Sequence, residues 1–266
     1  MFDALYIAAT GMHAHQSQVD VIANNVANLN TVGFRRGVVS FSEATAAVAS
    51  VSQSDGVGPP GAASATSNGT LRGAGALAHA MLSMSGGELK QTGQSLDVAI
   101  EGAGFLEVVR PDGTPGYTRA GALSVNPDGL LALQDGTPLA GRIAVPPDAK
   151  EIRIDSDGTV LALVEGQTDP VEVGHIELAS FGNPAALQGV GSNQFVATAQ
   201  SGDARVGTPG QEGRGSVRQG FLESSNVQLV EEMVAMMLAQ RAFELDGRVV
   251  QAADQMMSIT NDLYRT

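Results

Sequence analysis

An apolar position recurs every seven residues near the start of the chain. Two such rows are offset by three positions: Leu5, Met12, Val19 and Val26 form one, and Ala8, His15, Ile22 and Leu29 form the other. This spacing is that of the a and d positions of a coiled-coil helix, and His15 is the only polar member. The pattern predicts a helix that ends close to Asn30 and whose apolar stripe needs a partner distant in the sequence.

The residues after this helix carry a stop signal. Gly33 is expected to adopt a positive φ, end the helix and redirect the chain, because glycine enters the left-handed region without steric cost. Arg35 and Arg36 follow near the negative end of the helix dipole.

The end of the chain repeats the seven-residue pattern. One row contains Leu229, Met236, Phe243, Val250, Met257 and Tyr264, and a second contains Ala239, Asp246, Ala253 and Thr260. A capping box of Ser225 and Gln228, or a cap by Asn226, predicts a helix over roughly 226–264. We expect Met12, Val19 and Val26 to pack against Met236, Phe243 and Val250, within one chain or between neighbouring copies.

The middle of the chain has two parts of different character. Residues 37–85 are rich in Ser, Ala, Gly and Pro, which favours an extended arm that orders against a partner over a simple linker. Residues 86–218 contain short β-rich runs separated by Asp-Gly turns, which predict an all-β domain.

These patterns together predict an α+β fold in four segments. Residues 1–36 and 219–266 form the N- and C-terminal helices of a coiled-coil domain, residues 37–85 form the extended connecting arm, and residues 86–218 form the inserted β domain. Two apolar helices at opposite ends of the chain can bury their faces only against each other and against further copies, so we expect a helical homopolymer.

Charge and composition remove several classes of function. The net charge is −13 with no basic patch, and no apolar run approaches the roughly 18 residues of a spanning helix, so we expect neither nucleic-acid binding nor membrane insertion. Cysteine is absent, which excludes thiolate metal sites and Cys nucleophiles.

The remaining candidate sites are weak. Residues 155–158 are similar to the opening of a calcium loop but lack its glutamate, and residues 102–104 lack the third glycine of a nucleotide fingerprint. His13 and His15 point away from each other on a helix. We expect no catalytic residue, cofactor or metal, and therefore no enzyme. A cell-wall hydrolase and a monomeric binding module built on the β domain remain as alternatives.

Both ends of the chain carry motifs that resemble one family. Residues 23–36, with Asn24, Asn25, Asn28, Thr31, Gly33 and Phe34, closely resemble the N-terminal motif of the bacterial flagellar axial proteins of the rod and hook. Residues 220–227, with Ser225 and Asn226, and residues 240–244, with Gln240 and Arg241, resemble the C-terminal motif. Residues 96–105 and 117–119 are similar to the central β domain of that family.

This resemblance implies a structural subunit of the flagellar basal body. The length of the chain and the residues of both terminal motifs are most similar to those of the distal rod type, with a proximal rod subunit as the alternative. The implied assembly is a helical tube that forms part of the drive shaft and export channel. The implied partners are the chain itself, proximal rod and hook subunits, the surrounding outer rings and the flagellar type III export apparatus, with a location in the periplasmic part of the basal body.

Overall fold

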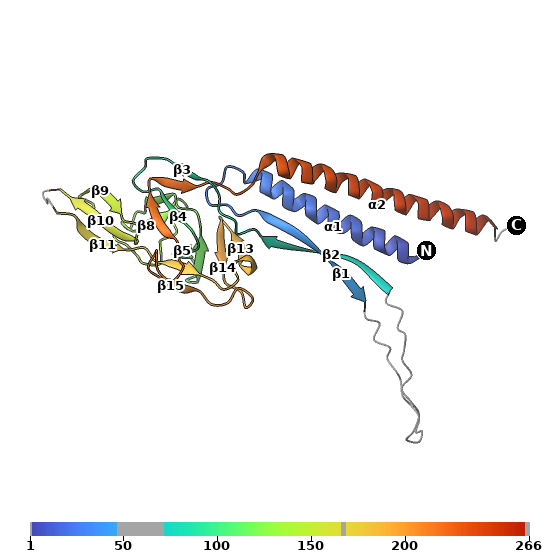
Figure 1. The fold of residues 1–266 in the computed structure, drawn as a ribbon, viewed down its shortest axis with the longest axis horizontal. Helices are drawn as coiled ribbons and strands as arrows, with labels where there is room; N and C mark the ends of the chain where they lie inside the picture. The colour runs from blue at the N-terminus through green and yellow to red at the C-terminus, as the bar shows by residue number, and fades with distance from the viewer. Residues whose placement is uncertain (1, 47–71, 166–168, 264–266) are drawn as a thin grey trace, which may run out of the picture. The chain divides into compact units, whose positions relative to one another are not determined.

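The computed structural model describes residues 2–46, 72–165 and 169–263 of the 266-residue chain. Two long helices at the chain ends and a β-rich middle confirm the α+β fold (Figure 1). The chain divides into two compact units. The helical unit contains Met1–Val21, Val39–Ala80 and Val234–Thr266, and the β unit contains Ile22–Val38 and Met81–Met233.

Helices α1 (Phe2–Ala27) and α2 (Leu229–Leu263) pair as a coiled coil, as the heptad rows predict. In the helical unit they lie side by side with the two chain termini at the same end, so they run antiparallel (Figure 1). The polar members of the two rows meet, because His15 Nε2 lies 3.8 Å from Asp246 Oδ2. A Cβ atom on Gly11 would lie 2.9 Å from the same Asp246 oxygen, so the glycine makes room for this carboxylate.

Small side chains continue this row. Ala8 precedes His15 by one heptad and is 5 % exposed, and Ala253 follows Asp246 by one heptad and is 3 % exposed. Because the two helices run antiparallel, Ala8 and Ala253 both lie one heptad from the pair of His15 and Asp246, toward the same end of the helices. The buried helix positions of the helical unit are therefore alanines: Ala8, Ala14, Ala239 and Ala253.

The larger apolar residues of the rows lie nearer the surface. Ile22 is buried, whereas Leu5, Met12, Val19, Val26, Leu29, Met236, Val250 and Met257 are half-buried. Phe243 is 44 % exposed, so its ring is not enclosed within the single chain. The expected packing of Phe243 against the row of α1 stays a prediction, and it concerns contacts between neighbouring copies.

Both helices are shorter than the sequence predicts at the ends that face the β-rich segment. Helix α1 ends at Ala27, three residues before Asn30. Asn28 Nδ2 donates to the carbonyl of Asn24 (2.9 Å) and Thr31 Oγ1 donates to Asn28 Oδ1 (3.1 Å), and this local bonding competes with further helical turns. Gly33 has the expected positive φ of 68°, but it lies in the turns beyond the helix.

The start of α2 differs for a related reason. The helix begins at Leu229, three residues after the predicted start at Asn226. Ser225 Oγ accepts the N–H of Val227 (3.3 Å), while Asn226 bonds to other segments instead of capping the helix. Because its side chain is bound to these distant segments, Asn226 does not cap the helix as predicted.

Most of the described part of the predicted arm consists of two strands. Strands β1 (Gly37–Ala46) and β2 (Arg72–Leu82) form a two-stranded sheet (Figure 1). Residues 47–71, the remainder of the predicted arm apart from its last three residues, lie outside the described residues.

The β unit is built from short antiparallel strands. Its largest sheet has the order β13-β14-β6-β5-β12-β15, beside a three-stranded sheet β11-β10-β9 and the pairs β16-β4, β17-β3 and β7-β8. The strands are β3 (Leu89–Gln91), β4 (Val98–Glu101), β5 (Phe105–Val109), β6 (Pro115–Thr118), β7 (Leu123–Val125), β8 (Leu131–Leu133), β9 (Ala149–Ile154), β10 (Thr159–Val164), β11 (Val171–His175), β12 (Leu178–Ser180), β13 (Gln188–Gly191), β14 (Gln194–Val196), β15 (Arg205–Gly207), β16 (Ser216–Gln219) and β17 (Phe221–Glu223). A short 3-10 helix spans Pro184–Ala186.

The Asp-Gly turns lie where the sequence predicts them. They connect β5 to β6, β7 to β8 and β9 to β10, with Gly113, Gly129 and Gly158 at φ of 79°, 77° and 90°. Asp157 Oδ1 accepts the N–H of Thr159 (3.0 Å), so residues 155–158 form a hairpin turn. Among the described residues, no group of three or more His, Asp or Glu side chains is placed to hold a metal ion.

The strands enclose one main apolar core. Leu106, Val108, Leu131, Val160 and Leu178 are completely or almost completely buried in it. A second cluster contains the ring of Phe105 with those of Tyr117 and Phe195. No helix in the described part of the chain is long and apolar enough to cross a membrane.

Candidate functional site at the junction of the terminal motifs

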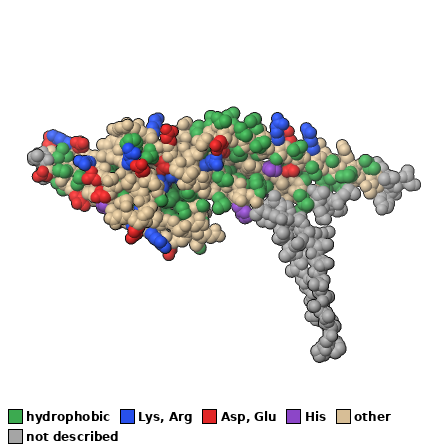
Figure 2. Space-filling view, viewed as in Figure 1, with side chains coloured by type: hydrophobic (Ala, Val, Ile, Leu, Met, Phe, Trp, Pro, Cys, Tyr) green, Lys and Arg blue, Asp and Glu red, His purple; other side chains and the backbone are tan. Residues whose placement is uncertain are grey.

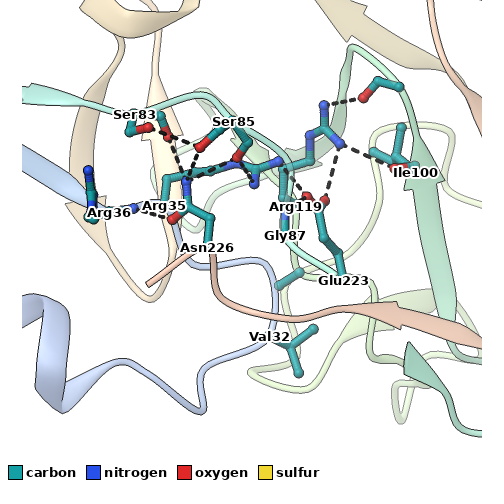
Figure 3. Close-up of polar contacts among 12 residues, drawn as sticks. Val32, Arg35, Arg36, Ser83, Ser85, Gly87, Ile100, Arg119, Glu223 and Asn226 are labelled. Carbon is teal, nitrogen blue, oxygen red and sulfur yellow. Dashed lines mark hydrogen bonds and ion pairs between the residues drawn. The ribbon is translucent and has the colours of Figure 1, made fainter. Parts of the chain in front are cut away.

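The chain segments that leave α1 and lead into α2 meet inside the β unit around one carboxylate. Glu223 Oε1 lies 2.7 Å from Arg35 Nη2, and Glu223 Oε2 lies 3.2 Å from Arg119 Nη1 (Figure 3). The three side chains are 2 %, 1 % and 7 % exposed, respectively. We call these three residues the ion-pair cluster.

Backbone groups complete the coordination of the ion-pair cluster. Arg35 Nη1 donates to the carbonyl of Ser85 (2.8 Å) and Arg119 Nη2 to that of Gly102 (2.6 Å), while Glu223 Oε1 accepts the N–H of Gly87 (2.9 Å). The pKa of Arg119 is lowered to about 10, mainly by burial. The carboxylate of Glu223 partly offsets this by raising the pKa, and the positive charge of Arg35 lowers it. Arg119 is therefore still a cation at neutral pH. The cluster holds five segments of the chain together, at Arg35, residues 85–87, Gly102, Arg119 and Glu223.

The side-chain amide of Asn226 joins two of these segments a second time, the one at Arg36 and the one at Ser83 and Ser85. Its Oδ1 accepts the backbone N–H of Arg36 (2.7 Å), and its Nδ2 donates to the carbonyls of Ser83 (3.1 Å) and Ser85 (3.0 Å) (Figure 3). An amide side chain offers two N–H donors and a carbonyl acceptor, whereas an ionised carboxylate has no donor and a hydroxyl has only one.

Asn25 has the same function on the other side of Arg36. Its amide bonds to both backbone groups of Gly37 at 2.9 Å and donates to Glu232 Oε2 at 3.2 Å. Glu232 is buried and also accepts from Arg36 Nη1 at 3.3 Å. The two asparagines thus fix the backbone between α1 and β1.

Gly33 is required for close approach as well as for its φ. Its N–H donates to the carbonyl of Glu223 (2.7 Å), and a Cβ atom at this position would overlap the carbonyl carbon and oxygen of Arg119. Contacts this short do not occur for real Cβ atoms. Asparagine tolerates the left-handed φ, but its Cβ would meet the same backbone atoms.

The remaining motif residues have more local contacts. Asn28 bonds to Asn24 in the last turn of α1 and to Thr31 beyond it. Phe34 instead makes a long-range contact, since its carbonyl accepts the N–H of Asn226 (3.4 Å). Gln240 and Arg241 are exposed on α2. The charged residues at the centre of the junction, Arg35, Arg119, Glu223 and Glu232, were not expected as site residues, although the first three lie within the resembling segments.

Helix α2 also carries a row of exposed apolar side chains. Figure 2 shows hydrophobic side chains gathered along the edge that α2 occupies in Figure 1. Leu238, Leu245, Val249 and Met256 are 63 %, 59 %, 48 % and 53 % exposed. Spacings of seven, four and seven residues place them on one helix face. We call these four residues the outer row.

Comparison with known proteins gives the same family along the whole chain. Three family models match: flagella basal body rod protein at residues 5–35, flagellar hook protein FlgE/F/G D1 domain at residues 99–162, and flagellar basal body rod FlgEFG protein C-terminal at residues 218–263. Each model contains one residue of the ion-pair cluster: the first contains Arg35, the second Arg119 and the third Glu223.

Relatives that match over their full length are also named as flagellar basal-body proteins. The flagellar basal-body rod protein FlgG of Borreliella burgdorferi is 39 % identical over 100 % of both chains, and that of Caulobacter vibrioides is 38 % identical over 98 % of both. The flagellar hook-basal body complex protein FlhP of Bacillus subtilis is 27 % identical over 99 % of this chain and 100 % of its own. The matched family models and these relatives thus place the chain among the flagellar rod and hook proteins. The chain belongs to the FlgG family of flagellar basal-body rod proteins and is a structural subunit.

Proposed function

We propose that this chain polymerises into the helical tube of the distal rod, which serves as drive shaft and as part of the export channel. The observation that carries this proposal is the outer row of α2, which remains exposed in the single chain. Burial of apolar surface contributes roughly 25 cal/mol per Å², so a row of four large side chains favours association strongly when copies are brought together.

The geometry of the partner helix favours a polymer over a closed pair. Helix α1 already covers one face of α2 through the His15 and Asp246 row, so the outer row is free for a neighbour. A contact between different faces of identical copies is heterologous, and it generates a helical filament when its rotation does not close a ring. The predicted rows of Met12, Val19 and Val26 and of Met236, Phe243 and Val250 belong to these contacts between copies in this proposal.

The further partners follow from the family. In this proposal the rod adjoins proximal rod subunits and hook subunits, passes through the surrounding outer rings, and receives its subunits through the flagellar type III export apparatus into the periplasm. Coverage of 98 to 100 % by relatives named FlgG supports the distal rod over the proximal alternative. Residues 1–36, 37–85, 86–218 and 219–266 remain the proposed domain limits. The relatives are named as rod proteins, which supports a subunit without catalytic residues, cofactor or metal.

The proposal is tested in a strain that lacks this gene. Basal bodies purified from it and viewed by electron microscopy are expected to end before the distal rod and to lack a hook. Expression of the full chain is expected to restore both. Complete rods in the deletion strain would contradict the proposed function.

A further inference from the structure

A pocket of about 410 Å³ opens against the ion-pair cluster of the β unit. Arg35, Arg119 and Glu223 line one side. The other walls are largely apolar and include Met84, Leu89, Ile100, Phe105 and Pro184. No contact within the described part of the chain assigns a role to this space.

The charges beside the pocket do not balance. Two guanidinium groups share the single carboxylate of Glu223, and all three side chains are at least nine-tenths buried. Glu101 also lines the pocket, but it is exposed and pairs with Arg218 at 3.4 Å. One buried positive charge is therefore in excess, and a buried charge without a counter-ion is unfavourable.

The hydrogen bonding of the two guanidinium groups is also incomplete. Nε of Arg35 and Nε of Arg119 are both buried, and neither has a hydrogen-bond partner among the described residues. A guanidinium group presents its donors in a planar fork that matches a carboxylate. The missing partner thus has the chemistry of one further carboxylate.

We propose that in the assembled rod this pocket binds an acidic side chain of a second copy of this chain, held by Arg35 and Arg119. This inference rests on the proposed polymer, which supplies one acidic segment for every pocket. The apolar walls suit the methylene groups and neighbours of a side chain better than a hydrated inorganic anion, and the volume admits more than one residue. The chain provides 28 acidic residues against 15 basic ones.

Photo-crosslinking in assembled rods tests the occupant directly. Ala103 lines the pocket and is exposed, so it can be replaced by p-benzoyl-phenylalanine without a change in the core. Ala199 is exposed outside the pocket lining and provides the matched control. Irradiation of rods is expected to join position 103 to a peptide of a second copy that contains Asp or Glu, and to give a different product, or none, from position 199.

A blocking substitution measures how much the contact matters. Ala103→Leu places bulk in the mouth of the pocket and is expected to lower rod yield about tenfold, the order expected when one buried anchoring contact is lost. Export and the melting temperature of the unassembled chain are expected to stay unchanged, and Ala199→Leu is expected to assemble normally.

The outcomes separate the two proposals. If wild-type chains form rods but position 103 crosslinks to no second copy, to a segment without an acidic residue, or to another protein, the pocket inference is wrong while the rod function stands. Normal rod yield from Ala103→Leu would also overturn it. If wild-type chains form no rods at all, the proposed function itself fails.

Discussion

His15 and Asp246 face each other across the helix pair, with Nε2 and Oδ2 separated by 3.8 Å. Each is the one charged or titratable residue in its own apolar row, and Asp246 Oδ2 is buried without a hydrogen-bond partner in the described chain. A polar pair in an apolar seam lowers stability but specifies register, because any slip leaves both groups against apolar neighbours. Gly11 adds a shape constraint, since its missing side chain leaves the space for Asp246.

Replacement of both residues by leucine is expected to separate stability from register. The double variant His15→Leu with Asp246→Leu should be at least as stable as the wild type but less specific in helix pairing. The chain has no cysteine, so Ala8→Cys and Ala253→Cys can report the register by oxidative or bis-maleimide crosslinking. Crosslinking should be efficient with the polar pair and weaker without it; equal yields would show that the pair does not set the register.

Loss of Glu223 is expected to be severe because it leaves two buried guanidinium groups without their carboxylate. Glu223→Ala should lower the free energy of unfolding by about 3 to 5 kcal/mol. Glu165 is the matched control, since its ion pair with Lys150 has side chains that are 70 % and 60 % exposed. Glu165→Ala should cost less than about 1 kcal/mol. Urea unfolding of the full chains followed by circular dichroism compares them, and similar midpoints would refute the structural role of the cluster.

Gly33 and Gly113 have similar φ values, 68° and 79°, but different surroundings. A Cβ at Gly113 meets nothing within 4 Å, whereas at Gly33 it meets the backbone of Arg119. Gly113→Ala should therefore cost only about 1 kcal/mol of backbone strain. Gly33→Ala and Gly33→Asn should both cost clearly more. If thermal denaturation gave equal losses at the two positions, the close approach would not be the reason for glycine.

Glu107 provides a prediction about pH. Burial, and then the nearby carboxylate of Glu177, raise the pKa of Glu107 above its usual value of 4.5. An acid with a raised pKa in the folded state binds more protons there than when unfolded, so its contribution becomes unfavourable as pH rises through the unfolded value. Glu107→Gln should raise the melting temperature at pH 7, and this gain should disappear below about pH 4. A gain that is independent of pH would contradict this explanation.

Local patterns predicted the parts of this fold that depend on neighbouring residues. The Asp-Gly turns before Thr114, Leu130 and Thr159 follow from two residues each, and both helices follow from repeated apolar spacing. The ion-pair cluster could not be predicted in this way, because Arg35 and Glu223 are far apart in the sequence and are brought together only by the complete β unit. The start of α2 was misplaced for the same reason, since Asn226 bonds to Arg36 instead of capping the helix.

The outer row of α2 is the central element of the proposed assembly. Leu238 belongs to this row and is 63 % exposed in the single chain. Gln251 is also exposed on α2 and lies about 140° around the helix from Leu238. Leu238→Glu and Gln251→Glu therefore place the same charge on different faces of one helix.

The two variants are compared by electron microscopy of basal bodies from strains that carry only one of them, with export of each variant verified. Leu238→Glu is expected to be exported but to build no distal rod, because a charge cannot be buried against a neighbouring copy, while Gln251→Glu is expected to retain substantially more rod. Complete rods of normal length built from the Leu238→Glu chain would contradict the claim that neighbouring copies cover the outer row.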